Sequence, residues 1–138
     1  MQSKLSVYPA ARQALPSMLA AIGSACAASA IPRPVLLRIE LVVEELVANT
    51  LEHGYRGRSE DMHIWMAVSA DAGGVCISYQ DEGPAFNPLS AEPGGAERAV
   101  LSGRPGGLGG ALIGALPVEA RYERTGGRNT LELRFPVT

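Results

Sequence analysis

Two polar side chains, Glu45 and Asn49, stand four residues apart in a segment that is otherwise largely apolar. If the segment is a helix, this spacing places both side chains on one face, one turn apart. A carboxylate buried there without a polar partner would be strongly disfavoured or would be neutralised. We therefore expect a polar ligand to meet this face of the helix. The plainer alternative is an exposed stripe that happens to carry Glu and Asn.

Two further segments contain residues that could bind a ligand. The first, Asp81-Glu82-Gly83-Pro84, follows a predicted strand, and alone it indicates only a turn because turns prefer Asp, Gly and Pro. The second is a glycine cluster at residues 103–110 that runs into a predicted helix. Backbone N–H groups at the N-terminus of a helix can hold an anion such as phosphate. A flexible linker is the plainer reading of this cluster.

The chain has a single lysine, Lys4, which excludes several classes of enzyme. The glycine cluster is not a Walker A loop, because no Gly-Lys-Ser/Thr follows it. Protein kinases of the Val-Ala-Ile-Lys type and pyridoxal enzymes both need a lysine at the site, so they are excluded as well. No cluster of His and Cys residues indicates a zinc site.

Composition limits the partners and the compartment. With 12 basic and 14 acidic residues and a net charge of −2, the chain has no basic stripe for a phosphate backbone, so direct nucleic-acid binding is not expected. No segment is long and apolar enough to cross a membrane, and we expect a cytoplasmic protein. Cys26 and Cys76 are expected to be reduced and to act as small core residues.

Hydrophobic periodicity predicts a single α+β domain over residues 1–138, a two-layer sandwich in which helices cover one face of a mostly antiparallel sheet. A long loop rich in Pro and Gly is expected from about residue 82 to 107, followed by a short helix after Gly109. The other predicted elements are a strand at residues 4–8, helices at 12–29 and 34–53, strands at 63–69 and 75–80, and a hairpin of 118–123 with 130–137.

Taken in order, the three sites read Glu-x-x-x-Asn on a helix, Asp-x-Gly after a strand, and a glycine loop before a helix. This order resembles the GHKL (Bergerat) ATP-binding fold of gyrase, Hsp90, histidine kinases and MutL. Residues 45–55, 81–88 and 129–136 are more closely similar to the small anti-sigma-factor serine kinases of the RsbW and SpoIIAB type. The resemblance extends over nearly the whole chain, from about Leu5 to Pro136.

The resemblance implies a role for each matching residue. Glu45 would be the general base for the attacking hydroxyl, and Asn49 would hold Mg²⁺ against the phosphates of ATP through its side-chain oxygen. Both roles suit the chemistry, since Mg²⁺ prefers oxygen ligands and a carboxylate can accept a proton. The remaining implied contacts are a hydrogen bond from the adenine amino group to Asp81, close approach of the base at Gly83, phosphate binding at Gly107 and Gly109, and support of the adenine side by Thr130.

The chain departs from the family pattern in its glycine loop. The family commonly has Gly-Arg-Gly-Leu-Gly, whereas here Pro105 and Gly106 separate Arg104 from Gly107. A phosphate contact by Arg104 is therefore not assigned. The lid over the nucleotide would span approximately residues 88–106. His53 lies one turn beyond Asn49, and it is left open whether it is structural or catalytic.

The resemblance implies an ATP-dependent protein serine/threonine kinase that acts as an anti-sigma regulatory factor. Its partners would be a sigma factor, which it sequesters, and a STAS-type anti-sigma-factor antagonist, which it phosphorylates. A homodimer is left open. The segment expected of a histidine kinase, a phosphoacceptor helix, is not found in the sequence. Two alternatives remain: a non-catalytic ATP-binding partner-switch module of the same fold, and a metabolic α+β domain whose motifs coincide by chance.

Overall fold

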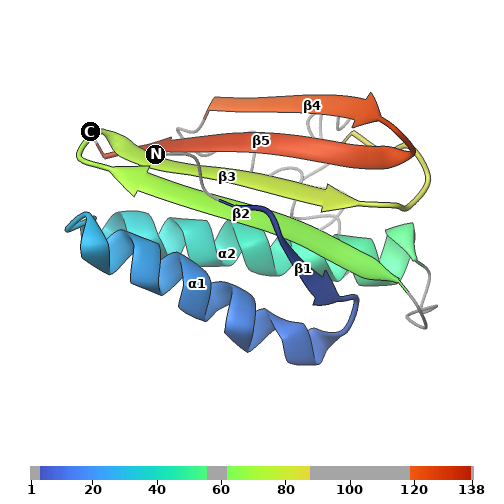
Figure 1. Cartoon of the computed structure of the whole chain (residues 1–138), viewed down its shortest axis with the longest axis horizontal. Coiled ribbons are helices and arrows are strands. Elements are labelled where there is room, and N and C mark those ends of the chain that lie inside the picture. The colour runs from blue at the N-terminus through green and yellow to red at the C-terminus, as the bar shows by residue number, and fades with distance from the viewer. Residues whose placement is uncertain (1–3, 56–61, 88–118, 138) are drawn as a thin grey trace, which may run out of the picture.

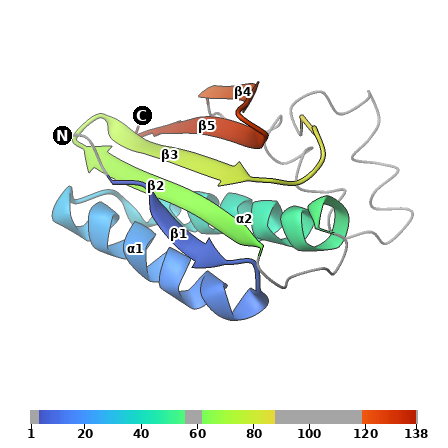
Figure 2. The same cartoon turned by 45° about the vertical axis from the view of Figure 1, so that its right-hand side comes forward.

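A computed structural model describes residues 4–55, 62–87 and 119–137 of the chain. Two helices pack on one face of a five-stranded antiparallel sheet, and the turned view places both helices on the same side (Figures 1 and 2). This is the two-layer α+β arrangement that the periodicity predicts. The lid, the glycine cluster and the short helix after Gly109 lie outside the described residues, and the prediction of one domain stays a prediction.

The two helices lie close to their predicted ranges. A 3₁₀ turn, η1 (Arg12–Ala14), leads into α1 (Leu15–Ala28), and α2 (Arg33–Asn49) follows. Pro32 is the N-cap residue of α2 and has an extended backbone. Proline is tolerated at the start of a helix but not in its interior, so the helix begins after it.

The second helix changes its hydrogen-bonding pattern after Asn49. Residues Thr50–Gly54 form a π-helical turn, η2, which closes with a 2.7 Å hydrogen bond from the Tyr55 N–H to the Thr50 carbonyl. The sequence predicts an uninterrupted helix to His53, so the change of pitch was missed. Single π-helical turns occur frequently at functional sites.

The sheet has the strand order β1-β2-β3-β5-β4, and every neighbouring pair is antiparallel. Two-residue turns join β2 to β3 and β4 to β5, and the second turn uses Gly126 and Gly127 at φ +59° and +78°. The strands are β1 (Ser6–Pro9), β2 (His63–Asp71), β3 (Gly74–Asp81), β4 (Glu119–Thr125) and β5 (Arg128–Pro136).

Alternation along the strands separates a core face from an outward face. The core face packs on the helices and includes Ile64, Met66, Val75, Ile77, Tyr79, Leu131, Leu133 and Phe135, all of them buried. Cys26 on α1 is buried as expected, but the expectation for Cys76 is wrong: it lies on the outward face of β3 and is exposed. Both cysteines are free.

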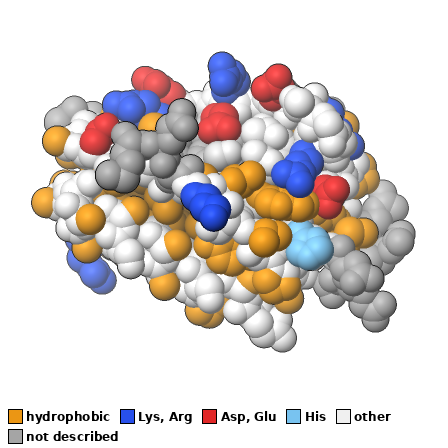
Figure 3. All heavy atoms as spheres, in the orientation of Figure 1, with side chains coloured by type: hydrophobic (Ala, Val, Ile, Leu, Met, Phe, Trp, Pro, Cys, Tyr) orange, Lys and Arg blue, Asp and Glu red, His pale blue; other side chains and the backbone are white. Residues whose placement is uncertain are grey.

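Figure 3 shows the surface in the orientation of Figure 1. Hydrophobic side chains gather over the region of β1, β2 and α1, and charged side chains of both signs lie mainly above them. Within the described residues, no helix is both long and apolar enough to cross a membrane.

Candidate functional site

The C-terminal end of α2 carries Glu45 and Asn49 one turn apart. Asn49 is the last residue of the helix and is 8% exposed. Glu45 Oε2 and Asn49 Oδ1 are buried, and neither has a hydrogen-bond partner among the described residues. Burial raises the pKa of Glu45, and the negative charges of Glu44 and Glu52 raise it further. The helix therefore presents two oxygens that can accept a proton or meet a cation.

Asp81 is the last residue of β3 and faces the helices, in register with Ile64 on β2 and Asn129 on β5. Its carboxylate is buried and accepts hydrogen bonds from three donors. Oδ2 accepts from the Thr50 hydroxyl at 2.8 Å, and Oδ1 accepts from the Gly83 N–H at 3.1 Å and from Asn129 Nδ2 at 2.9 Å. These donors come from three separate parts of the chain, so they hold the carboxylate in one orientation.

Tyr79 connects this carboxylate to the end of α2. Its hydroxyl lies 2.6 Å from the Thr50 hydroxyl and donates to the Leu46 carbonyl at 3.1 Å. Tyr79 is fully buried, and burial raises its pKa well above 10. It therefore stays neutral in the physiological range and can serve only as a fixed hydroxyl group.

Gly83 packs directly against Gly54 at the end of η2. A Cβ atom at Gly83 would lie 3.0 Å from the Gly54 Cα and 3.3 Å from its carbonyl carbon. Few real Cβ atoms approach backbone that closely, so a side chain at Gly83 would require the backbone of Gly54 to shift. The sequence predicts close approach of a base at Gly83, whereas the close contact observed in the structure is with the backbone of Gly54.

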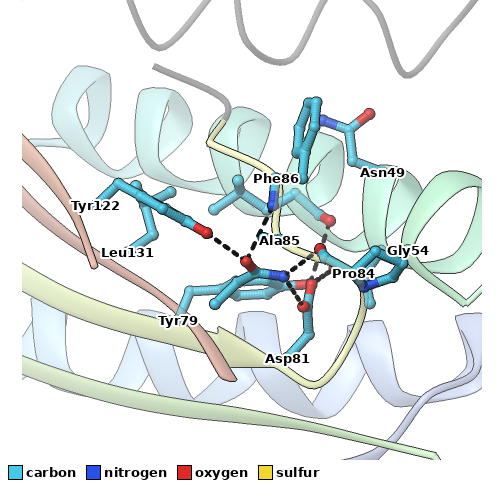
Figure 4. Close-up of a pocket in the computed structure, with 12 residues that line it drawn as sticks. Asn49, Gly54, Tyr79, Asp81, Pro84, Ala85, Phe86, Tyr122 and Leu131 are labelled. Atoms are coloured by element: carbon cyan, nitrogen blue, oxygen red, sulfur yellow. Dashed lines mark hydrogen bonds between the residues drawn. The ribbon is translucent and has the colours of Figure 1, made fainter. Parts of the chain in front are cut away.

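A cavity of about 230 Å³ lies above these groups (Figure 4). This is smaller than the roughly 300–1,000 Å³ that encloses a drug-sized ligand, so it suits a planar base better than a whole nucleotide. Asn49 lines the cavity and Glu45 lies one turn back from it. The lining consists of Leu46, Asn49, Thr50, Gly54, Tyr79, Asp81, Pro84, Ala85, Phe86, Tyr122, Asn129 and Leu131.

The structure brings Asn49 and Asp81 to one cavity, with Gly83 behind it. Thr130 lies elsewhere: it pairs with Gln80 and Glu123 in the outward-facing row of the sheet, whereas its neighbours on β5 line the cavity. Gly107, Gly109 and Arg104 lie outside the described residues, as does the side chain of His53.

Sequence reasoning missed several polar residues of the site, chiefly Thr50, Asn129, Tyr122 and Arg124. A signal for Asn129 was present. Leu131, Leu133 and Phe135 alternate toward the core, and the same period of two places residue 129 on the core face and residue 130 on the other. No comparable signal marked Thr50, because its position depends on the π-helical turn.

The chain is similar to known proteins in family and in fold. Residues 8–135 match the histidine kinase-like ATPase domain family. Among solved structures, the SiaB–SiaC complex from Pseudomonas aeruginosa contains a chain with a TM-score of 0.59 and 16% identity, covering 98% of this chain and 90% of that one. The histidine kinase AdeS from Acinetobacter baumannii gives a TM-score of 0.49 and 13% identity, with 100% and 70% covered. No curated protein sequence matches the chain.

The family match spans nearly all of the chain and includes the helix, the strand end and the cavity described above. The fold shared with the SiaB–SiaC structure extends over most of both chains. The GHKL resemblance that the motifs suggest is therefore confirmed, and the chain belongs to the family of histidine kinase-like ATPase domains.

Proposed function

We propose that the chain is an ATP-dependent protein serine/threonine kinase that acts as an anti-sigma regulatory factor. The observation that carries the proposal is the pair of buried, unpartnered oxygens on Glu45 and Asn49, one turn apart beside a cavity of base size. Family membership supports ATP as the nucleotide. Serine/threonine specificity follows from the resemblance to the RsbW and SpoIIAB type.

The adenine base would occupy the cavity between α2 and the sheet. Asp81 would accept a hydrogen bond from the exocyclic amino group of adenine, since three fixed donors already orient its carboxylate. The apolar side chains of Leu46 and Leu131 would contact the faces of the ring. Phosphate binding by Gly107 and Gly109 remains part of the proposal.

The residues present fit a magnesium ion carried by the phosphates. Asn49 Oδ1 is a buried hard oxygen without a partner among the described residues, which is the donor type that Mg²⁺ prefers. Those residues contain no cluster of three His, Cys, Asp or Glu side chains, so most of the ligands would be phosphate and water oxygens. When bound, the ion would neutralise negative charge on the phosphates.

Glu45 would act as the general base. Its carboxylate would accept the proton of a serine or threonine hydroxyl on the acceptor protein. The hydroxyl oxygen would form a bond to the γ-phosphorus of ATP while the bond to the bridging β,γ-oxygen breaks, and ADP would leave with that electron pair. The raised pKa of Glu45 makes the carboxylate a stronger base than an exposed glutamate.

The partners are a STAS-type antagonist as the phosphoacceptor and a sigma factor as the sequestered protein. The solved structure with a TM-score of 0.59 is itself a complex with a second protein, which supports a partner-binding role at the level of the fold. A second candidate is a non-catalytic nucleotide-binding switch module. A pure binder would need Asn49 and Asp81 but no base, so the half-buried carboxylate of Glu45, with its buried Oε2, favours the kinase.

The test separates binding from transfer. Titration calorimetry with Mg·ATP on wild type, Asn49→Ala and Asp81→Asn measures binding, and incubation of wild type and Glu45→Ala with ATP and a purified STAS-type protein measures transfer. The kinase predicts weaker binding in the first two variants, and loss of transfer with intact binding in Glu45→Ala. Binding without transfer in wild type supports the switch module, and binding that neither Asn49→Ala nor Asp81→Asn changes removes this site.

A further inference from the structure

The side chain of Asn129 joins the carboxylate of Asp81 to the loop that follows it. Asn129 stands opposite Asp81 in the β3–β5 register, and its Nδ2 donates to Asp81 Oδ1 at 2.9 Å. The same nitrogen lies 2.9 Å from the Pro84 carbonyl and 3.3 Å from the Gly83 carbonyl. One amide group therefore holds both the carboxylate and the backbone beside it.

The other end of the amide is also occupied. Asn129 Oδ1 accepts from the Phe86 N–H at 3.1 Å and from the Tyr122 hydroxyl. An asparagine side chain has two N–H protons and one oxygen with two lone pairs, so its whole capacity is used. Three acceptors face the nitrogen and two donors face the oxygen, and this fixes which way round the amide lies.

Asp81 has almost no acceptor capacity to spare. Oδ1 is occupied by the Gly83 N–H and by Asn129 Nδ2, while Oδ2 receives only the Thr50 hydroxyl. A carboxylate oxygen has two lone pairs, so one acceptor position is left on Oδ2. Because Asp81 lines the cavity, a group in the cavity that meets this position must donate a hydrogen bond.

We propose that Asn129 is the positioning residue that makes the cavity select a base with an exocyclic amino group, adenine, over one with a carbonyl at that place, guanine. Asn129 occupies Oδ1 together with the Gly83 N–H, so that the single free acceptor of Asp81 is on Oδ2. A carbonyl oxygen there would face a carboxylate oxygen without a proton between them, which is repulsive. This inference rests on the proposed binding of a purine nucleotide, and it assigns to Asn129 a part in base selection.

An Asn129→Asp variant keeps the shape and removes the donor. Two carboxylates at hydrogen-bond distance cannot both be ionised without strong repulsion, so they hold one proton between them at low pH and lose it as the pH rises. With the proton in place, the new carboxyl group can donate to Asp81 as the amide did. The variant is therefore expected to regain selectivity for ATP in acid, whereas the amide of wild type does not titrate.

Other ionisable groups around this contact do not produce the same pattern. Burial raises the pKa of Tyr55 to about 12 and that of Tyr79 well above 10, so neither titrates near neutrality. Arg124 on β4 donates to the Gly83 carbonyl at 2.6 Å. Tyr122 contacts the far end of the Asn129 amide, and Glu82, next to Asp81 in the chain, is exposed. The carboxylate pair is thus the group whose charge changes in the variant.

A matched control is available on the neighbouring residue of β3. Gln80 lies next to Asp81 but faces outward, where it accepts from Arg128 Nη1 at 3.2 Å. Gln80→Glu makes the same change of amide to carboxylate, adds the same charge and leaves the contact between Asn129 and Asp81 intact. Any general effect of charge or of handling therefore appears in this variant as well.

The experiment measures dissociation constants for ATP and GTP with Mg²⁺ by titration calorimetry, between about pH 5.5 and pH 8.5. Wild type and Gln80→Glu are expected to prefer ATP at every pH. Asn129→Asp should lose roughly tenfold to a hundredfold in ATP affinity at the alkaline end with little change for GTP, and should recover at the acid end. Asn129→Ala should lose selectivity at every pH.

Circular dichroism checks that each variant is folded. If Asn129→Ala does not fold, the Asn129→Asp variant alone tests the inference. If Asn129→Asp is folded and its ratio of ATP affinity to GTP affinity equals that of wild type at every pH, the inference is wrong, but the proposed function is not affected. A loss of affinity for both nucleotides by the same factor also overturns the inference, because that is the mark of a merely structural role. A wild-type protein that binds neither nucleotide overturns the proposed function together with the inference.

Discussion

Glu45 and Asn49 lie one turn apart on α2, and each keeps one buried side-chain oxygen without a hydrogen-bond partner in the described parts of the chain. Leaving a buried polar group unpaired costs about 1–3 kcal/mol. Two such groups side by side are unusual in a small domain, where buried polar atoms are nearly always satisfied. Their arrangement is best explained by a ligand that supplies the missing partners.

Glu45→Gln should abolish phosphotransfer without abolishing nucleotide binding. The amide keeps the shape of the side chain but cannot accept the proton, so the rate should fall by ~10²–10⁴-fold. Initial rates of transfer and calorimetry with Mg·ATP measure the two properties separately. Glu44→Gln is the control, because Glu44 is the adjacent exposed carboxylate and should keep its transfer rate at neutral pH. A fall of similar size in both variants would count against the role of Glu45.

The same Glu45→Gln substitution should increase thermal stability at neutral pH. Burial and the charges of Glu44 and Glu52 raise the pKa of Glu45 above its ordinary value of 4.5, so the folded state binds this proton more tightly than the unfolded state does. The ionised carboxylate therefore destabilises the fold above the raised pKa, and the penalty disappears below the ordinary pKa. Melting temperatures of wild type and variant should differ at neutral pH and converge in acid.

The rate of phosphotransfer should fall as the pH drops through the raised pKa of Glu45. A general base works in its ionised form, so the acid limb of the rate profile should lie above the pH at which an exposed glutamate titrates. Glu44→Gln removes one of the charges that raise this pKa and should move the limb toward lower pH. A limb that stays in place in Glu44→Gln would show that another group controls the profile.

Asn49→Ala should weaken nucleotide binding mainly when Mg²⁺ is present. The substitution removes the amide oxygen assigned to the ion, and the expected loss of ATP affinity is about tenfold, or 1.4 kcal/mol. Calorimetry with Mg²⁺ and with a chelator measures the difference for wild type and variant. An equal loss in both conditions would place Asn49 in contact with the nucleotide and not with the ion.

Gly83→Ala should destabilise the fold by about 1–3 kcal/mol, because the new methyl group would lie 3.0 Å from the Gly54 Cα. Urea denaturation measures the free energy of unfolding. The control is Gly23→Ala within α1, where an added Cβ meets nothing within 4 Å and should stabilise the helix by roughly 0.5–1 kcal/mol. A neutral Gly83→Ala would indicate that the contact between the two glycines relaxes easily.

The parts of the fold that depend on local periodicity could be predicted from the sequence. The amphipathic pattern places Glu45 and Asn49 on one face of α2, and the alternation of β3 places Asp81 at a strand end. Both placements need only residues within a few positions of each other. Cys76 was misplaced because it was assigned by residue type alone, although the alternation of Val75, Ile77 and Tyr79 leaves it on the outward row of β3.

The contacts that complete the site depend on pairings that no local pattern contains. Asn129 meets Asp81 across 48 residues of sequence, through a pairing of β3 with β5 that leaves out β4. Thr50 reaches Asp81 only because the helix changes to a π-helical turn after Asn49. The residues of β5 that face the cavity could therefore be identified only from the strand register of the sheet.

Transfer of the γ-phosphoryl group of ATP to a protein, with Glu45 as the base, is the activity proposed for this chain. The most direct measurement is phosphotransfer from γ-labelled ATP with Mg²⁺ into a lysate of the host cell, with wild type, Glu45→Ala and the Glu44→Gln control side by side. A small labelled protein is expected with wild type and with Glu44→Gln, and none with Glu45→Ala. Equal labelling by Glu45→Ala would remove Glu45 as the base, and no labelled protein with a wild type that binds ATP would rule out the kinase.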